Sequence, residues 1–333
     1  MPVTVWGAFN KFRSDVVDLD TAQTKQARAS RDNLAEQLRA LNSKVVGFPT
    51  VTGAYNFGSF ARRTKIRPLN DIDMMILLSD AGTSERQDSS SIYRYWLHID
   101  DKTKPLAAFS DEHGYVNSTK VLNKIKTSLS TISHYSKADI KRNQAAVTLD
   151  LKSYPWVFDI VPAVGIKNYA GTVTHYLIPD GAGKWMRTDP RTDSSNMTAA
   201  NVLHGGELLP VMRLLKHWNN RTYNKSRLLP YYFETLVLNT LKSTYKITSA
   251  QEGIKRFFDY GSIYLNSSCA DPKRLGPNLD AGIDAATKQK IAAAMSEAAT
   301  NAGYAIMYEG QGDHKTAIYW WGRVFGPEFP TYE

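Results

Sequence analysis

The stretch "NFGSFARRTKIRPLNDIDMMILL", residues 56–78, places two aspartates at the start of an apolar run. Asp71 and Asp73 stand two residues apart, so their side chains share one face of a β-strand. Two neighbouring carboxylates repel each other and a buried strand avoids charge, which indicates a cation between them. Just upstream, Gly58 and Ser59 form a turn that opens a helix, where backbone N–H groups and a hydroxyl can take phosphate oxygens. Together these features predict Mg²⁺ bridged to phosphates.

Composition limits the class of protein and its partners. The chain has 333 residues, 42% of them apolar, which is enough to bury a sizeable core. Its net charge of +9 favours anionic partners such as nucleotides, phosphates or nucleic acid. A single cysteine, Cys269, excludes disulfides within the chain and a Cys-rich zinc module. Because no apolar run reaches the length of a signal peptide or membrane span, we expect a cytoplasmic protein with no membrane partner.

The first half of the chain alternates between helical and strand patterns. A helix without Gly or Pro is followed by short apolar runs rich in β-branched residues and separated by turn residues. The predicted elements are helices over 20–43, 60–64 and 118–134, strands over 45–55, 72–78, 145–151 and 156–164, and a mobile polar surface excursion at 79–92.

The second half has helical periodicity throughout. Residues 165–205 are rich in Gly, Asp, Ser and Thr, and we expect the boundary there between a core lobe over 1–190, which includes the long N-terminal helix, and a helical lobe over 191–333. Pro230 suits the first turn of a helix, and Ser249 with Glu252 forms a capping box. One further helix has the apolar face Leu208, Met212, Leu215 and Trp218, and the last two are predicted over 285–302 and 314–326.

A third carboxylate is expected if two metal ions act together. Asp159, in "WVFDIVP", is a single charge within an apolar strand, and we favour it for this position. Its alternative role is that of a capped aspartate at a strand end. Asp150 is the competitor, but its place just before Lys152 and a turn suits a solvated strand end better.

These motifs carry a resemblance to a known family. "GSFARRT", "DIDMMILL" and the strand-borne Asp159 before "IVPAV" resemble the polymerase-β-like nucleotidyltransferase superfamily. "LLPVMRLLKHWN", "LPYYFETLVLNTL" and "WWGRVFGPEFP" resemble the bacterial CD-NTases, relatives of cyclic GMP-AMP synthase and oligoadenylate synthase. The resemblance covers nearly the whole chain. It implies an α+β fold of two lobes, a polymerase-β-like nucleotidyltransferase core with a mixed sheet and a helical C-terminal lobe like that of oligoadenylate synthase.

The resemblance also implies roles for the acidic residues and for the turn. Gly58 and Ser59 would hold the donor triphosphate. Asp71, Asp73 and Asp159 would bind two Mg²⁺ ions, with Mn²⁺ as a possible substitute, and Asp159 would act as the base for the acceptor hydroxyl.

Three residues of the second half would contact the nucleotide. By the resemblance, Lys216 in "LLKHW" reaches the β- and γ-phosphates of the donor; its alternative is a solvated helix lysine. Tyr231 and Tyr232 stand where the family commonly has a serine before an aromatic residue. The phenol of Tyr231 can donate a similar hydrogen bond to phosphate. Tyr232 can stack on a base or pack in the core.

The function implied by the resemblance is that of an enzyme, a cyclic oligonucleotide synthase. It would join nucleoside triphosphates into a cyclic di- or trinucleotide second messenger, by attack of a ribose hydroxyl on an α-phosphate with release of pyrophosphate. Family members act in bacterial anti-phage signalling, so the expected partners are nucleoside triphosphates and an effector that recognises the product. We expect no obligatory nucleic-acid activator, because a single cysteine cannot build the His/Cys zinc module of the DNA-sensing animal relative.

Two alternative functions stay open. One is a nucleotidyltransferase that modifies a protein, an RNA or a small molecule, although minimal enzymes of that kind are shorter. The other is a catalytically silent module that binds nucleotide or RNA. The presence of aspartate at all three acidic positions argues against a silent module.

Overall fold

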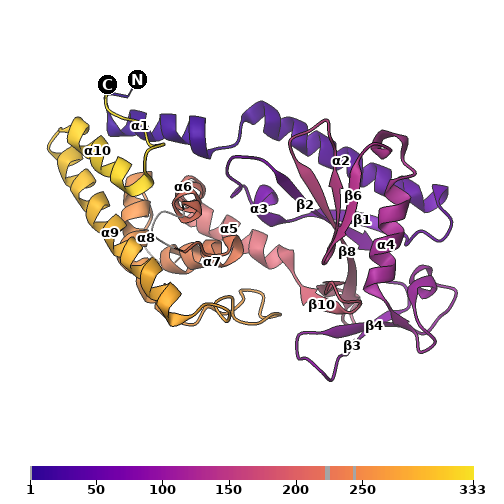
Figure 1. The fold of residues 1–333 in the computed structure, drawn as a ribbon. Coiled ribbons are helices and arrows are strands. Elements are labelled where there is room, and N and C mark those ends of the chain that lie inside the picture. The colour runs from indigo at the N-terminus through magenta and orange to yellow at the C-terminus, as the bar shows by residue number, and fades with distance from the viewer. Residues whose placement is uncertain (1, 222–225, 243–244) are drawn as a thin grey trace. The chain divides into compact units, whose positions relative to one another are not determined.

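The computed structural model describes residues 2–221, 226–242 and 245–333 and divides into two compact units. The first, which we call the sheet unit, comprises Thr21–Arg62 and Leu69–Thr192 (Figure 1). The second, the helical unit, comprises Met1–Asp20, Arg63–Pro68 and Asp193–Glu333. The helical unit thus takes in two segments from the N-terminal part of the chain. These contact-defined units do not test the division into lobes at 1–190 and 191–333, which stays a prediction.

The sheet unit is built on one mixed, ten-stranded sheet. Its main path runs β1-β2-β8-β9-β10-β4-β3, with β5 paired to β4 and β7 paired to both β6 and β8. Strands β2 and β8 run parallel, and the other described pairs are antiparallel. The strands are β1 Val51–Asn56, β2 Asp71–Leu78, β3 Thr83–Gln87, β4 Tyr95–Ile99, β5 Tyr115–Val116, β6 Asp139–Asn143, β7 Ala146–Asp150, β8 Val157–Lys167, β9 Val173–Pro179 and β10 Trp185–Thr188.

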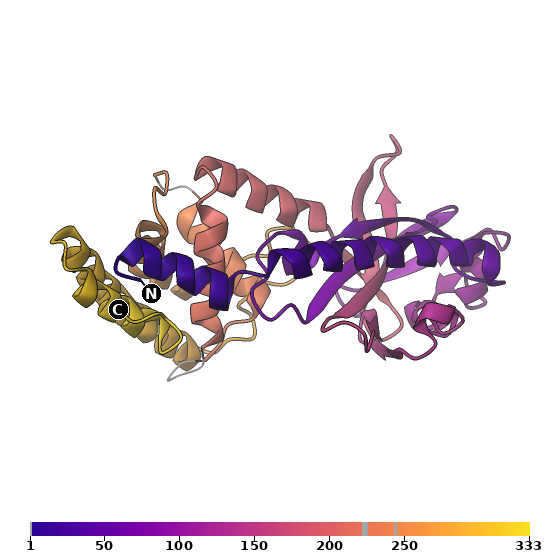
Figure 2. The same ribbon diagram turned by 90° about the horizontal axis from the view of Figure 1, so that it is seen from above.

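The two faces of strand β2 differ. Ile72, Met74 and Ile76 are fully buried on one face, as expected for a strand whose alternate residues enter a core. Helix α2 (Thr21–Lys44) contacts β1 and β2, and α4 (Ser118–Leu129) contacts β6, β7 and β9 (Figure 2). On the other face, Met75 belongs to a small apolar cluster with residues of β8 and β9. Asp71 and Asp73 share this second face, where they remain half-buried.

The helical unit has its own apolar core. Phe9 of α1 packs edge-on against Trp321 of α10 at 5.0 Å between ring centroids, and the rings of Phe12 and Phe325 lie 5.3 Å apart. The predicted stripe of Leu208, Met212, Leu215 and Trp218 is buried in this core. The helices are α1 Val5–Phe12, a π-helical turn Arg13–Val17, α5 Pro190–Leu203, α6 Leu208–Asn220, α7 Pro230–Leu241, α8 Ala250–Asn266, α9 Ala285–Gly310 and α10 His314–Phe325. The first residues of α5, up to Thr192, belong to the sheet unit.

The α+β fold and most predicted elements are confirmed, including helix starts at Pro230 and at the Ser249 cap. Within the described residues, no helix combines the length and apolar character needed to cross a membrane. Several boundaries were wrong. The helix predicted over 285–302 continues to Gly310, and the strand predicted over 156–164 continues to Lys167. The short helix α3 spans Gly58–Ala61, the strand predicted from residue 45 begins only at Val51, beyond Pro49, and the helix from Ser118 ends at Leu129, where a Ser/Thr-rich segment disfavours helix.

The polar segment 79–92 was also predicted wrongly. It is not only a surface excursion, because it contains β3, which pairs with β4. Strand β3 lies at the edge of the sheet and exposes most of its side chains, so its sequence lacks the apolar alternation that marks other strands.

Candidate active site

The parallel pairing of β2 and β8 brings the predicted acidic residues together. Asp73 and Asp159 are register partners, so they lie side by side on strands about 4.8 Å apart and on the same face of the sheet. Asp71 lies two residues before Asp73 on that face. Asp150, the competitor, is exposed on β7, where it is paired with Val157 and separated from β2 by strand β8. The structure therefore groups Asp159, and not Asp150, with the first two aspartates.

Gly58 lies directly against this acidic face. Its φ of +75° is a conformation that residues with a side chain rarely adopt, and a Cβ added to it would overlap the carboxylate of Asp73. Helix α3 starts at Gly58, and Ser59 is its second residue. The turn at the start of α3 and the carboxylate of Asp73 are thus adjacent within the sheet unit, as a site for phosphate and metal requires.

The position of Gly58 gives a first prediction. We expect Gly58→Ala to displace Asp73 and to strain the turn, lowering the free energy of unfolding by about 1–3 kcal/mol and eliminating activity. Thermal unfolding and the assay described below measure the two effects. Gly53→Ala in β1 is the matched control, because a Cβ there makes only ordinary contacts, 3.5 Å from Leu77. Equal effects of the two substitutions would contradict the role of Gly58.

The acidic face has the donor chemistry that Mg²⁺ prefers, since all its candidate ligands are carboxylate oxygens. Among the described residues, no three His, Cys, Asp or Glu side chains already converge into a metal cage. Mg²⁺ is usually held by one or two carboxylates together with substrate phosphates rather than by protein ligands alone. The adjacent pair Asp73 and Asp159, beside the turn at Gly58, fits that mode of binding.

Sequence reasoning missed a residue next to Asp159. Thr148 of β7 is the register partner of Asp159 on the side away from β2. Its hydroxyl donates a 2.7 Å hydrogen bond to Oδ1 of Asp159. Such a bond fixes the orientation of a carboxylate on a strand. No local pattern in the sequence marks Thr148, because its place depends on the register of two antiparallel strands.

Lys216 lies in the helical unit and is buried, with an exposed fraction of 6%. Its Nζ forms an ion pair with Oε1 of Glu234 in α7 at 2.5 Å. The same carboxylate oxygen accepts a 2.9 Å hydrogen bond from Thr64, and both Glu234 and Thr64 are buried. Lys216 is therefore not the solvated helix lysine that was its alternative. Its contact with donor phosphates stays a prediction.

Tyr231 belongs to a cluster of charged side chains within the helical unit. Its phenol donates a hydrogen bond of 2.7 Å to Asp193 and accepts one from Lys273, which also pairs with Asp271 at 2.8 Å. Burial, and then the charges of Asp193 and Asp271, raise the pKa of Tyr231 well above its ordinary value. The hydroxyl therefore stays protonated, and it donates its proton to the carboxylate of Asp193.

Tyr232 lies in the core of the helical unit, with an exposed fraction of 1%. Burial raises the pKa of its phenol, which keeps the hydroxyl neutral. This placement favours the packing role that the sequence left open over base stacking. A nucleotide-binding role for either tyrosine stays a prediction.

A mixed sheet that carries adjacent aspartates on parallel strands, beside a glycine turn that opens a helix, defines a nucleotidyltransferase core of the polymerase-β-like class. No protein-family model matches the chain. The chain is 38% identical, over 336 aligned positions that cover 100% of both proteins, to the "Probable cyclic nucleotide synthase" of Bacillus cereus strain VD146. It belongs to the bacterial CD-NTase family.

Solved structures share its fold over almost the full length. CdnC of E. coli MS115-1, solved with ATP, superposes with a TM-score of 0.70 at 18% identity and covers 97% of this chain and 98% of its own. Vibrio cholerae DncV, a cyclic AMP-GMP synthase solved with the linear intermediate 5′ pppA(3′,5′)pG, gives a TM-score of 0.66 at 12% identity and covers 98% and 96%.

Proposed function

We propose that this protein condenses nucleoside triphosphates into a cyclic di- or trinucleotide second messenger. Membership of a family that includes a probable cyclic nucleotide synthase at 38% identity supports the reaction class. The observation that supports a metal-dependent mechanism most directly is the pairing of Asp73 with Asp159 on adjacent parallel strands, against the turn at Gly58. That arrangement can hold a triphosphate and a cation on one face of the sheet.

In the proposed mechanism, the turn at Gly58 and Ser59 binds the donor triphosphate through backbone N–H groups and the Ser59 hydroxyl. Asp71, Asp73 and Asp159 would hold two Mg²⁺ ions, and these ions would supply neutralisation of the charge that develops on the phosphate oxygens. Asp159 accepts the proton of the attacking ribose hydroxyl. The α-phosphorus gains a bond to that oxygen while its bond to the leaving pyrophosphate breaks. The same step, repeated once for a dinucleotide or twice for a trinucleotide, closes the ring.

The proposal extends to the substrates and the protein partner of this enzyme. CdnC has been solved with ATP and in a complex with a HORMA protein lacking its N-terminal part, and DncV has been solved with ATP and GTP. We propose nucleoside triphosphates as substrates here, an effector that recognises the product in anti-phage defence, and activity without a nucleic-acid activator. Two observations support anionic nucleotide substrates: relatives have been solved with bound nucleotides, and this chain has a net charge of +9.

The assay that tests this function uses purified protein, α-³²P-labelled ATP, GTP, CTP and UTP, and Mg²⁺. After phosphatase treatment, thin-layer chromatography should show a resistant labelled product, and mass spectrometry should identify it as cyclic. Asp73→Asn protein is the control for contaminating enzymes. Transfer of label to a macromolecule would favour the alternative transferase. The absence of any transfer would favour a silent module. Synthesis that depends on added nucleic acid would indicate an enzyme that nucleic acid activates.

The hydrogen bond from Thr148 to Asp159 predicts a positioning role. We expect Thr148→Val to lower kcat about tenfold, the equivalent of a hydrogen bond of about 1.4 kcal/mol, with KM for triphosphate nearly unchanged. Thr148→Ser should restore kcat, because it keeps the hydroxyl. Thr52→Val is a matched control, since Thr52 also donates from the sheet, to the carbonyl of Leu77, without touching an aspartate. A fall in thermal stability with unchanged kcat would show that Thr148 is only structural.

A further inference from the structure

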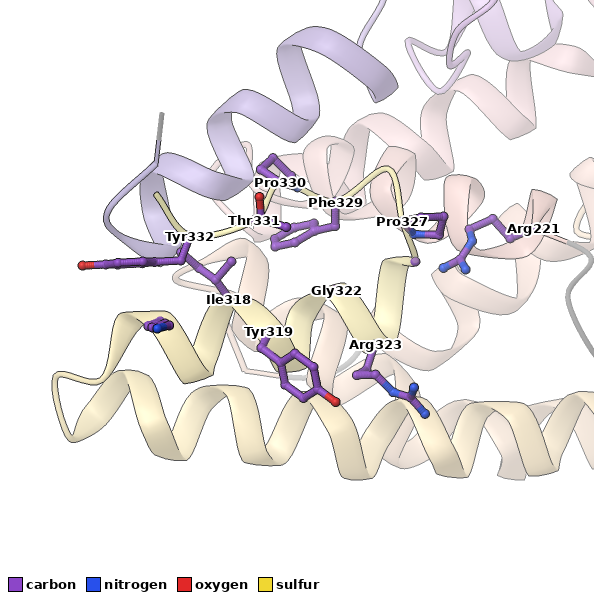
Figure 3. A pocket seen from close by; sticks show the side chains of 12 residues that line it. Arg221, Ile318, Tyr319, Gly322, Arg323, Pro327, Phe329, Pro330, Thr331 and Tyr332 are labelled. Carbon is purple, nitrogen blue, oxygen red and sulfur yellow. The ribbon is translucent and has the colours of Figure 1, made fainter.

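The helical unit contains a cavity of about 580 Å³ between α10 and the segment that follows it. Figure 3 shows Phe329, Pro330 and Thr331 on one side of this cavity and the helix face of Ile318 and Gly322 on the other. We call it the α10 pocket. Its volume suits a drug-sized ligand. It is lined by Arg221, Lys315, Ile318, Tyr319, Gly322, Arg323, Gly326, Pro327, Phe329, Pro330, Thr331 and Tyr332.

The charge of the α10 pocket is positive. Arg221, Lys315 and Arg323 line it, and none of the described lining residues is acidic. Glu328 lies near enough to interact with Arg221, but it accepts a 3.0 Å hydrogen bond from His217. Arginine guanidinium groups recognise phosphate through paired, charge-assisted hydrogen bonds. The pocket therefore favours an anion, and phosphate in particular.

The two arginines also border a second cavity. This neighbouring cavity, of about 360 Å³, shares Arg221 and Arg323 with the α10 pocket and adds one cation and one carboxylate of α9, Lys290 and Glu297. Arg221 is anchored by a hydrogen bond of 3.3 Å to the carbonyl of Val324 at the end of α10, and its guanidinium lies against Gly326. One arginine is thus held in place at the junction of the cavities, where an anionic group would meet it.

The rest of the α10 pocket is apolar and aromatic. Phe329 and Ile318, on opposite sides of it, are almost fully buried, whereas Tyr319 and Tyr332 are exposed at 60% and 40%. Figure 3 places Arg221 and Arg323 at the Pro327 end and Tyr332 at the opposite end. Aromatic side chains stack on flat rings with little sequence or base preference. A ligand with an anionic group at one end and a planar ring at the other matches this arrangement.

Gly322 keeps the space open. It lies within α10, where glycine is less favourable than alanine, and a Cβ added there would meet no atom within 4 Å beyond the helix's own backbone. Packing therefore does not require a glycine at this position. Because Gly322 lines the α10 pocket and the space around its Cβ is open, we choose a larger side chain at this position to fill the pocket.

We propose that the α10 pocket is a binding site for a nucleoside phosphate, with the phosphate at Arg221 and Arg323 and the base towards Tyr332. The lining residues of this site all belong to the helical unit, and the aspartates of the proposed reaction belong to the sheet unit. It goes beyond the proposed reaction, because none of its lining residues has a role in the mechanism proposed above.

The test measures binding of AMP, by calorimetry without Mg²⁺, to the full chain carrying Asp73→Asn. AMP has no pyrophosphate to lose, and the background removes a metal ligand from the proposed reaction site. We expect one AMP per chain, at least tenfold weaker binding with Arg323→Gln, and no measurable binding with Gly322→Leu. Thermal unfolding should show that Gly322→Leu is folded, because its side chain enters open space.

Control variants and control ligands separate binding at the α10 pocket from binding elsewhere on the protein. Arg28→Gln, at an exposed arginine of α2, and Gly310→Leu, at a helical glycine with equally open surroundings, should bind AMP like the parent. Inorganic phosphate and adenosine alone should each bind at least tenfold more weakly than AMP. The proposal is overturned if AMP does not bind, if Gly322→Leu and Arg323→Gln bind it unchanged, or if inorganic phosphate binds as tightly as AMP.

Discussion

Asp73→Asn is expected to lower product formation by at least about 1,000-fold, and Asp159→Asn to do the same. Loss of a metal ligand removes several kilocalories per mole of transition-state stabilisation, and about 4 kcal/mol corresponds to a factor of 1,000. Both substitutions keep the shape of the side chain. Because Asp73 and Asp159 are adjacent carboxylates on neighbouring strands, loss of one charge should leave thermal stability unchanged or raise it.

Three measurements check this prediction. The labelled-nucleotide assay gives the rate, thermal unfolding gives the stability of each variant, and unfolding with Mg²⁺ and ATP reports binding. Wild-type protein should be stabilised by Mg²⁺ with ATP, and Asp73→Asn protein should not.

Asp150→Asn is the matched control, at an exposed aspartate on the same sheet. It should retain wild-type activity. Full activity in Asp159→Asn together with loss in Asp150→Asn would transfer the role of third ligand to Asp150. Full activity in Asp73→Asn would exclude the acidic face as the reaction site.

Much of this site could be predicted from sequence because its signals are local. The alternation of a strand places Asp71 with Asp73, and the turn at Gly58 lies close in sequence to the strand that it serves. Asp159 could be predicted for a different reason, as a charge that an apolar strand does not otherwise tolerate. Its register with Asp73 could not, since the pairing of β2 with β8 joins segments more than eighty residues apart.

The residues that pair with the predicted site residues are less clearly marked in the sequence. Glu234 is a single charge within the apolar helix segment "YYFETLV", so the argument that identified Asp159 also applied to it. Thr148 has no such signal, because threonine is ordinary in a strand. Strand β3 was missed because an edge strand with exposed side chains has the composition of a loop. Long-range pairing and edge position are properties of the tertiary structure, which local patterns do not specify.

The second large effect is expected at the buried pair Lys216 and Glu234. Removal of one partner of a buried ion pair leaves an uncompensated charge, and it typically lowers the free energy of unfolding by about 3–5 kcal/mol. Lys216→Met should therefore destabilise the protein strongly, because Glu234 has an exposed fraction of only 3%. Activity lost in this variant would not by itself identify a phosphate contact.

A second substitution separates structure from catalysis. Lys216→Met combined with Glu234→Gln removes both charges and keeps an acceptor for the hydroxyl of Thr64, so it should recover most of the stability that Lys216→Met loses. If Lys216 contacts the donor phosphates, the double variant should be stable yet show KM for triphosphate raised about tenfold or more, as expected for loss of a charge-assisted contact of about 1.5–3 kcal/mol. Glu234→Gln alone is the control that keeps the lysine. If the double variant recovers both stability and the wild-type KM, the role of Lys216 is limited to packing and charge pairing in the core of the helical unit.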